Sequence, residues 1–411
     1  MTGDISASQD DDRAVLAINA GSSSLKIRLY AMAQEHLLFE GHVERIGEVD
    51  SHCVYRVYDT GGAVSEQIQS IATTDHASAL QQLFAALNKY HTGNTMPVLS
   101  AIGHRVVHGG ETFQEPTLID ADVIDSLRAL IPLAPLHNPA NLATIETARR
   151  LYPQVMQVAV FDTAFFHTLP PYACRYAVPE KLYREQHVRR YGFHGTSHQQ
   201  AARQAADYLQ QPLTSLRLIT LHLGNGASAA AIRDGRCIDT SMGMTPLEGL
   251  IMGTRCGDLD PAVPLYLART MGMSTDDIED LLNHDSGMKG LCGAADMRDI
   301  HRLADRGDQQ ARLAIDMYCY RIAKYVGAYY IALGGVDALV FTGGIGENDA
   351  RIRQAVCAQL SPLGIRVDER ANQAESATPC DISKASSNAS VLIVTANEEL
   401  EIARQALAMT P

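Results

Sequence analysis

Two segments far apart in the chain share one design: a strand, a turn of small residues and a second strand. Residues 14–30 read AVLAINAGSSSLKIRLY, and residues 216–240 read LRLITLHLGNGASAAAIRDGRCIDT, where a third strand follows a DG turn. Alternating aliphatic residues around a tip rich in glycine and serine are typical of β-hairpins. The repeat predicts two similar lobes that each present such a turn to one cleft. Because neither the residues nor the period repeat strictly, two unrelated hairpins are the alternative.

The length of the chain also indicates more than one domain. Its 411 residues exceed the roughly 250 to 300 at which a single hydrophobic core stops growing. Apolar residues recur at helical spacing over residues 78–90 and from about 310 to 333, and apolar strands such as ALVF and VLIVT alternate with such patterns. Alternating helices and strands predict the α/β class.

The charge of the chain argues against several kinds of partner. Apolar residues make up 46% of the chain and charged residues 20%, a profile typical of soluble globular proteins. The net charge of −13 opposes binding to nucleic acid or to an anionic membrane surface, because both require a basic patch. An anionic substrate would therefore need arginine or lysine placed locally in its site.

The cysteines and the N-terminal residues bear on the location of the protein. The eight cysteines are scattered and form no C-x-x-C pair, which favours reduced thiols in a cytosol. The first dozen residues, MTGDISASQDDD, are polar and lack an apolar stretch, so we expect a disordered tail and no secretory signal. No apolar run approaches the roughly 20 residues that cross a bilayer.

Three turns rich in small residues could approach phosphate groups closely. The first is NAGSSSLK, residues 19–26, in which Lys26 supplies a cation; the others are LGNGAS, residues 223–228, and TGGIGEN, residues 342–348. None matches the P-loop pattern G-x-x-x-x-G-K-[ST], and each turn by itself is more often structural than functional. Three of them, each directly after an apolar strand, favour a nucleotide cleft.

Two arginines are candidates for binding a small anion. Arg105 lies in GHRVVHGGE together with His108, and Arg255 lies in the glycine-rich MGTRCGDLDP. A planar guanidinium can bind a carboxylate or a phosphoryl group through two hydrogen bonds. The alternative for each is an ion pair at the surface. Together the two arginines could clamp a small, doubly anionic reaction centre.

Asp162 and two histidines complete the residue-level candidates. Asp162 directly follows the apolar run VAVF, where a strand of an α/β fold ends beside a ligand site, but it would serve equally well as a helix N-cap. His194 and His198 lie four residues apart in YGFHGTSH without the glutamate of the zinc motif H-E-x-x-H. An imidazole facing a transferred phosphoryl group is one interpretation, and a structural histidine is the other.

With these pieces in order, the sequence from Val15 to Ala408 resembles the acetate kinase family, part of the superfamily of acetate and sugar kinases, heat-shock ATPases and actin. The resemblance is carried by INAGSSSLK, GHRVVHGGE, LAPLHNP, FDTAFFHTLP, YGFHGTSH, HLGNGAS, DTSMGMTPLEGL, MGTRCGDLDP, FTGGIGEN and NEELEIAR. The sequence departs from it in the acidic tail and in TANEEL, where the family commonly has TNEEL.

The resemblance implies an α/β fold with two similar lobes of the actin-like ATPase (ribonuclease H-like) type and an active site in the cleft between them. It implies a tail over residues 1–13, an N-terminal lobe of residues 14–161 with a returning helix in 396–411, and a nucleotide-binding lobe of residues 162–395. A cytoplasmic homodimer is also implied.

The resemblance further implies reversible transfer of the ATP γ-phosphoryl group to acetate, giving acetyl phosphate and ADP. Arg105 and Arg255 would hold the acetate carboxylate and the transferred group, His194 would stabilise its equatorial oxygens, and Asp162 would be the catalytic aspartate. Asn19 and Glu398 would order Mg²⁺, for which Mn²⁺ could substitute. Because acetate is already ionised at pH 7, Asp162 is expected to position groups rather than to accept a proton.

The same carry-over places the remaining contacts. His137 would line the site, and an acyl pocket of Val107, Leu136, Phe193 and Pro246 would favour a methyl group over a longer chain. The alternatives are a propionate or short-chain acyl kinase of the same family, and a nucleotide-binding switch of the actin or heat-shock type. ATP or ADP would lie along Lys26, His222, Leu223, Gly224, Asn225, Gly226, Asp296, Met297, Arg298, Gly344, Ile345, Gly346, Glu347 and Asn348.

Overall fold

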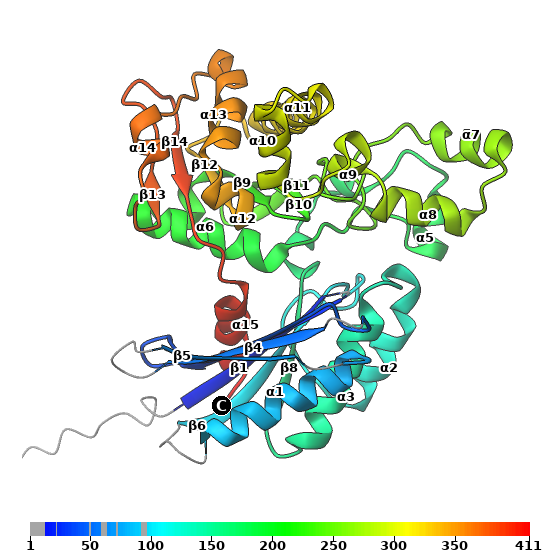
Figure 1. The fold of residues 1–411 in the computed structure, drawn as a ribbon, viewed down its shortest axis with the longest axis vertical. Coiled ribbons are helices and arrows are strands. Elements are labelled where there is room, and N and C mark those ends of the chain that lie inside the picture. Colours follow the sequence, from blue (N-terminus) through cyan, green and yellow to red (C-terminus); the bar gives the residue numbers. More distant parts are fainter. Residues whose placement is uncertain (1–12, 22, 49–50, 59–63, 71–72, 92–96) are drawn as a thin grey trace, which may run out of the picture. The chain divides into compact units, whose positions relative to one another are not determined.

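The computed structural model describes residues 13–21, 23–48, 51–58, 64–70, 73–91 and 97–411. The expected disordered tail over residues 1–13 therefore lies outside the described residues except for Arg13, and Ser22 of the first turn lies outside them as well. The chain forms two compact units (Figure 1). The first comprises Met1–Ala164 and Asn397–Pro411, and the second comprises Phe165–Ala396.

The first unit is built on one mixed sheet. Within its described residues the strand order is β5-β4-β3-β2-β1-β6-β8-β7. Strands β1 to β5 pair antiparallel in sequence, whereas β6 and β8 continue the sheet parallel to β1. The strands are β1 (Arg13–Ala20), β2 (Ser24–Ala31), β3 (His36–Glu44), β4 (His52–Tyr58), β5 (Val64–Ser70), β6 (Val98–Val106), β7 (Thr117–Leu118) and β8 (Met156–Phe161).

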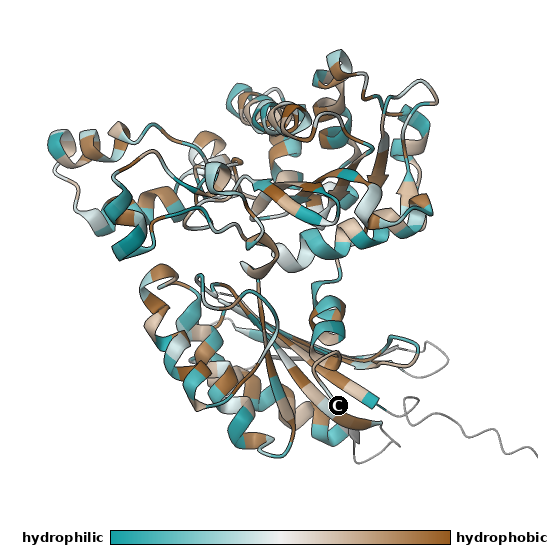
Figure 2. Cartoon of the chain, turned by 180° about the vertical axis from the view of Figure 1, so that it is seen from behind, coloured by the Kyte–Doolittle hydropathy of each residue, from teal (hydrophilic) through white to brown (hydrophobic). Residues whose placement is uncertain are grey.

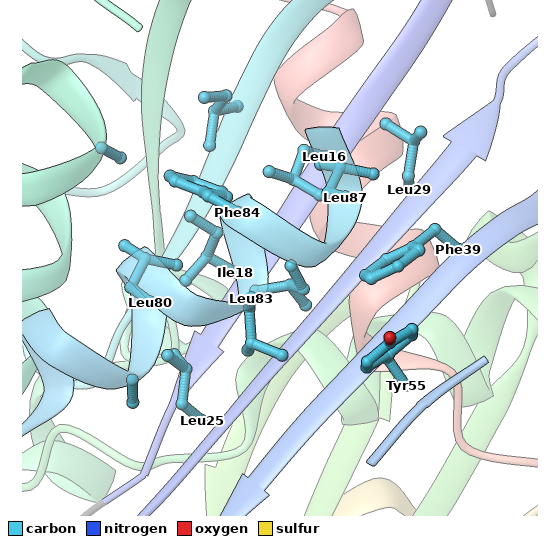
Figure 3. Close-up of a cluster of buried hydrophobic side chains, with 14 of the residues drawn as sticks. Leu16, Ile18, Leu25, Leu29, Phe39, Tyr55, Leu80, Leu83, Phe84 and Leu87 are labelled. Carbon is cyan, nitrogen blue, oxygen red and sulfur yellow. The ribbon is translucent and has the colours of Figure 1, made fainter. Parts of the chain in front are cut away.

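Helices cover both faces of this sheet because β1 is apolar on both sides. Leu16 and Ile18 pack under α1, whose Leu80, Phe84 and neighbouring side chains lie over β1 and β2 in Figure 3. Val15 and its alternate neighbours face the C-terminal helix α15 instead, which lies beside the blue strands in Figure 1. The helices of this unit are α1 (His76–His91), α2 (Ala121–Ala129), α3 (Asn138–Leu151) and α15 (Glu398–Leu407).

The second unit has a smaller sheet of the same plan. In its described residues, which are continuous, the order is β11-β10-β9-β12-β14-β13, with β9 to β11 antiparallel and β12 and β14 parallel to β9. The strands are β9 (Arg217–Leu223), β10 (Ala227–Arg233), β11 (Arg236–Thr240), β12 (Ala338–Thr342), β13 (Cys380–Asp381) and β14 (Ser390–Ile393). Helices pack on both faces, α6 against β9 and β12 and α11 against β10 and β9.

The helices of the second unit are α4 (Pro171–Cys174), α5 (Glu180–Gln186), α6 (Gly195–Leu209), α7 (Ala262–Met271), α8 (Thr275–His284), α9 (Gly287–Cys292), α10 (Met297–Asp305), α11 (Gln309–Leu333), α12 (Gly343–Asn348), α13 (Ala350–Gln359) and α14 (Glu369–Gln373). Figure 2 shows apolar, brown segments in the strands of both sheets and alternating teal and brown along the helices. This is the pattern of helices that bury one side against a sheet.

Both sheets contain the same core of three antiparallel strands followed by two parallel ones, β3-β2-β1-β6-β8 and β11-β10-β9-β12-β14. The α/β class and the two similar lobes predicted from the repeated hairpin are confirmed. The predicted turn TGGIGEN differs in detail, because α12 begins at Gly343 and winds this segment into a short helix. All eight cysteines are free thiols, and no helix in the described ranges is long and apolar enough to span a membrane.

Candidate active site

Polar side chains meet at the carboxyl end of the parallel strands of the first unit. Asn19 and Arg105 are the next-to-last residues of β1 and β6, and Asp162 directly follows β8. Because these three strands run parallel, their carboxyl ends lie on the same side of the sheet. Ligands of α/β proteins usually bind at the carboxyl ends of the strands. The hairpin register places Lys26 of β2 opposite Asn19.

Arg105 connects the three strands. Its Nε and Nη2 donate to one oxygen of Asp162 at 3.0 and 2.5 Å, and its Nη1 donates to Oδ1 of Asn19 at 2.9 Å. Asp162 is only 1% exposed, and the helical turn after it spans just Ala164–Phe166. Burial by itself would lower the pKa of Arg105, but the charge of Asp162 raises it, so the guanidinium stays charged.

The amide of Asn19 also reaches helix α15. Its Nδ2 donates to Oε1 of Glu399 at 3.1 Å, so a single side chain joins Arg105 to the returning helix. The neighbouring Glu398 lies within the field of Arg105 and Asp162. Desolvation raises the pKa of Glu398 to about 7, an effect that Arg105 opposes and Asp162 strengthens.

These residues fit a Mg²⁺ ion. The amide oxygen of Asn19 and the carboxylate of Glu398 are hard oxygen donors of the kind this ion prefers, and a divalent cation would offset the desolvation that raises the pKa of Glu398. Among the described residues, no cluster of three or more His, Cys, Asp and Glu could hold a metal. Two protein ligands would suffice for this ion, because Mg²⁺ commonly keeps several waters and shares substrate phosphates.

A buried charge network behind Asn19 was missed by the sequence reasoning. Glu399 accepts hydrogen bonds from Asn19 and from Nη1 of Arg28, the latter at 3.2 Å, and lies 3.4 Å from Nζ of Lys26. Arg28 also donates to Glu40 at 2.7 and 2.9 Å. The signal was present in the sequence, since Lys26 and Arg28 alternate along β2 and must share one face of the sheet.

Two asparagines of the motif LAPLHNPAN hold the loop that follows Arg105. Oδ1 of Asn141 accepts the N–H of Val107 at 3.0 Å, and Asn138 exchanges two hydrogen bonds with the backbone of His108. Asn141 also donates to the carbonyl of Ala20 at the end of β1. Sequence reasoning had chosen only His137 and Leu136 from this motif; His137 stands at the N-terminus of α3 and Leu136 is 45% exposed.

Two of the three small-residue turns lie together in the second unit. A Cβ on Gly343 would come within 2.8 Å of the carbonyl oxygen of Leu223, and a Cβ on Gly253 within 2.2 Å of Oδ1 of Asn225. The turn 223–226, the start of α12 and the loop at Gly253 are therefore in direct contact, and larger side chains at these glycines would force them apart.

His194 lies beside the same turn. A Cβ on Gly226 would lie 3.3 Å from Nε2 of His194 and 3.8 Å from Nη1 of Arg255. The ring of His222 lies 4.3 Å from that of His194, centroid to centroid. Arg255 donates from Nη1 to the carbonyl of Pro246 at 2.9 Å. The structure thus brings His194, His222, Gly226, Arg255 and Pro246 together, with Phe193 buried directly before His194.

The remaining predicted nucleotide residues have clear structural roles. Asp296 caps α10 by accepting the N–H of Arg298 and also binds its guanidinium, which holds the pKa of Asp296 at about 2. Arg298 is exposed, whereas Met297 is buried. In α12, Oε1 of Glu347 accepts the N–H of Ala396, and the buried Arg353 donates to the carbonyls of Gly346 and Glu347 at 2.9 and 2.7 Å.

The predicted residues thus fall into two groups, each assembled within one unit. The first unit holds Asn19, Lys26, Arg105, Val107, Leu136, His137, Asp162 and Glu398, and the second holds Phe193, His194, His222, Leu223, Gly224, Asn225, Gly226, Pro246, Arg255, Asp296, Met297, Arg298, Gly344, Ile345, Gly346, Glu347 and Asn348. Contacts between residues distant in sequence join Asn19, Arg105 and Asp162 in the first unit. In the second unit they join His194, Gly226 and Arg255.

Two units with this strand order define the actin-like ATPase (ribonuclease H-like) fold class, and comparisons with known proteins specify the family. The acetokinase family profile matches residues 14–404. The chain belongs to the acetokinase family. It is 53% identical to the acetate kinase of Streptomyces avermitilis over 96% of this chain and 97% of the relative, and 50% identical to that of Syntrophobacter fumaroxidans over 96% of both.

Solved structures agree with this assignment. A propionate kinase from Francisella tularensis has a TM-score of 0.89 at 39% identity and covers 96% of this chain and 99% of its own. An acetate kinase from Porphyromonas gingivalis has a TM-score of 0.87 at 41% identity and covers 97% and 99%. The fold is therefore shared by kinases named for two different acids.

Proposed function

We propose that the protein is an acetate kinase that transfers the γ-phosphoryl group of ATP reversibly to acetate. The observation that carries the proposal is the group that Arg105 and Asn19 form with the buried Asp162 at the end of three parallel strands. It holds a charged guanidinium in a fixed orientation, which suits a carboxylate or a phosphoryl oxygen. Relatives at 50–53% identity over nearly the whole chain carry the name acetate kinase.

The chemistry asks for positioning and positive charge. A carboxylate oxygen of acetate attacks the γ-phosphorus, the bond to the bridging oxygen of ADP breaks, and the P–O bond of acetyl phosphate forms. Because acetate is ionised at neutral pH, no general base is needed, and Asp162 serves to orient Arg105. Arg255 and the imidazole of His194 would neutralise charge on the transferred oxygens.

Mg²⁺, or Mn²⁺ in its place, would be held by Asn19 and Glu398 together with phosphate oxygens. The ion supplies positive charge to the phosphates when bound. Arg105 and Glu399 hold the amide of Asn19 from its two ends, so its oxygen and its nitrogen have fixed directions.

The nucleotide is proposed to lie along the turn 223–226 and α12. Arg353 then affects ATP binding indirectly, because it fixes two carbonyls at the end of α12. We expect Arg353→Met to raise the KM for ATP about tenfold, the equivalent of about 1.4 kcal/mol, while the KM for acetate changes little. Steady-state kinetics with each substrate varied in turn measure this.

Arg351→Met is the matched control for this prediction. Arg351 lies in α13, as Arg353 does, and pairs with Asp305, but the side chains of Arg351 and Asp305 are both more than half exposed. Its replacement should leave both KM values unchanged, since exposed ion pairs contribute little. Equal KM values for ATP in the two variants would contradict the role given to Arg353.

The acid is proposed to be acetate rather than propionate. Val107 and Phe193 are buried, Pro246 is held by Arg255, and Leu136 is exposed; all four carry apolar surface. The structural likeness to a propionate kinase keeps the longer acid as the alternative. One methylene is worth only about 1–3 kcal/mol, so we expect kcat/KM for acetate to exceed that for propionate by about tenfold or more. A ratio below one would assign the enzyme to propionate.

The other alternative is a protein of a different class, a nucleotide-dependent switch without an acid acceptor. An assay of both products distinguishes it from a kinase. Acetyl phosphate trapped as its hydroxamate should form in proportion to ADP, and only when acetate is present. ADP formation that is independent of acetate would favour the switch.

We further propose that the protein is a homodimer and acts in the cytoplasm, where ATP is available. Family membership supports both proposals. Light scattering after size exclusion measures the mass of the assembly.

A further inference from the structure

His194 is held by a chain of buried side chains in the second unit. The chain runs from Thr220 through His198 and Ser228 to His194. Oγ1 of Thr220 lies 2.7 Å from Nδ1 of His198, Nε2 of His198 lies 2.7 Å from Oγ of Ser228, and that oxygen lies 2.9 Å from Nδ1 of His194. Thr220, His198 and Ser228 are each fully buried.

The fold explains why these four side chains meet. Thr220 lies on β9 and Ser228 on β10, and the hairpin register pairs Ser228 with His222 and Ala230 with Thr220, so both hydroxyls point to the same face. Helix α6 covers that face and carries His198 in its first turn. His194 stands at the N-cap of α6 in a left-handed backbone conformation, with φ of 58°, which is unfavourable for a residue other than glycine.

Proton counting restricts the direction of this chain. The hydroxyl of Ser228 has one proton and two lone pairs, so between the two ring nitrogens it either donates to one and accepts from the other, or accepts from both. Burial lowers the pKa of His198 well below its ordinary value, and His222 lowers it further, so His198 is neutral and carries one N–H. His198 therefore donates on one side and accepts on the other.

We infer that the chain runs from Thr220 to His194 and fixes the tautomer of His194, with Thr220, His198 and Ser228 as positioning residues for the transfer reaction. The Thr220 hydroxyl donates to Nδ1 of His198, Nε2–H of His198 donates to Ser228, and Ser228 donates to Nδ1 of His194. The single proton of a neutral His194 then resides on Nε2, the nitrogen beside Gly226 and Arg255. In the opposite direction Nδ1 would carry the proton, and a neutral ring would present a lone pair at Nε2.

The inference rests on the proposed role of His194 as a donor to the transferred phosphoryl group. Fixing the tautomer in advance keeps the N–H directed at the developing charge without a rearrangement during the reaction. It also explains why Ser228, which has no direct part in the transfer, lies between the two imidazoles.

Long-range ¹H–¹⁵N NMR of protein labelled at histidine tests the tautomer without any substrate. The His194 signals are identified by their loss in His194→Asn. We expect the pattern of an Nε2–H ring in the wild type, and a mixture with the Nδ1–H form in Ser228→Ala. An Nδ1–H or doubly protonated His194 in the wild type, or an unchanged tautomer in Ser228→Ala, would overturn the inference.

Kinetics provide the second measurement. Ser228→Ala should lower kcat about tenfold, the equivalent of one hydrogen bond, with both KM values nearly unchanged. Ser241→Ala is the matched control, because Ser241 is equally buried and binds the backbone N–H of Ala229 instead of an imidazole. It should keep wild-type kcat and the wild-type tautomer. Equal losses of kcat in both variants would indicate a merely structural role.

A milder variant covers the case in which Ser228→Ala folds poorly. Thr220→Val keeps the shape of the side chain and removes only the hydroxyl, three hydrogen bonds away from His194. We expect it to change the NMR pattern of His198 and to shift the tautomer of His194 partially; unchanged spectra of both rings would overturn the inference. If the wild type forms no acetyl phosphate, the proposed function fails, whereas the NMR measurement still decides the tautomer.

Discussion

Arg105→Ala should lower kcat for acetyl phosphate formation by about 10³-fold, in line with the effect of arginines that stabilise phosphoryl transfer. The guanidinium is held by Asp162 and Asn19, and its charge is the one we propose to face acetate and the transferred group. The hydroxamate assay measures the loss. Arg105→Lys should also lose activity, because an ammonium group cannot reproduce the contacts of Nε, Nη1 and Nη2 at once.

Two comparisons make this prediction specific. Because Asp162 is buried, Arg105→Ala leaves a carboxylate without its cation, and circular dichroism must show that the variant is folded. Arg105→Lys keeps a cation beside Asp162, so a loss of activity in this variant cannot be attributed to an unpaired buried carboxylate. Arg128→Ala in the same unit removes an exposed arginine paired with Asp125 and Glu146, and it should leave kcat unchanged. Wild-type kcat in both Arg105 variants would refute the role.

Glu399→Gln should lower the free energy of unfolding by about 3 kcal/mol, because breaking a buried ion pair leaves charge without its partner. Burial by itself would raise the pKa of Glu399, but Lys26 and then Arg28 lower it, so the carboxylate is ionised and compensates both cations. The substitution keeps the size of the side chain, removes its charge and replaces one acceptor oxygen by an NH2 group. Urea unfolding followed by circular dichroism measures the change.

The same variant should weaken the response to Mg²⁺. One oxygen of Glu399 accepts from Asn19 and the other accepts from Arg28, whereas glutamine has a single oxygen for both. The amide of Asn19 can then turn, and the Mg²⁺ concentration for half-maximal rate should rise. Glu48→Gln is the control, since Glu48 pairs with Arg45 where both side chains are about half exposed. That change should alter neither stability nor the response to Mg²⁺. Equal stability of the two variants would show that the network contributes nothing to the fold.

Local sequence patterns determined much of the fold. The alternation in residues 14–30 and 216–240 predicted the hairpins of β1–β2 and β9–β11, and helical spacing predicted α1 and α11. These predictions succeed because apolar residues recur with the period of the strand or helix whose one face is buried. The motifs identified the family, since they are short segments whose residues contact one another or one ligand. Arg105 and Asp162 were found this way.

The tertiary structure alone decided the partners of those residues. Nothing in the sequence distinguishes Asp162 as the acceptor of Arg105 from Asp162 as a helix cap; the parallel pairing of β6 with β8 does, because it places both at one edge of the sheet. Glu399 contacts Arg28 because the C-terminal helix α15 packs against the sheet of the first unit. Ser228 lies between two imidazoles only because α6 covers the β9–β10 hairpin. Such contacts join residues far apart in sequence. They depend on which elements pack against one another, and the local spacing of apolar residues does not determine that packing.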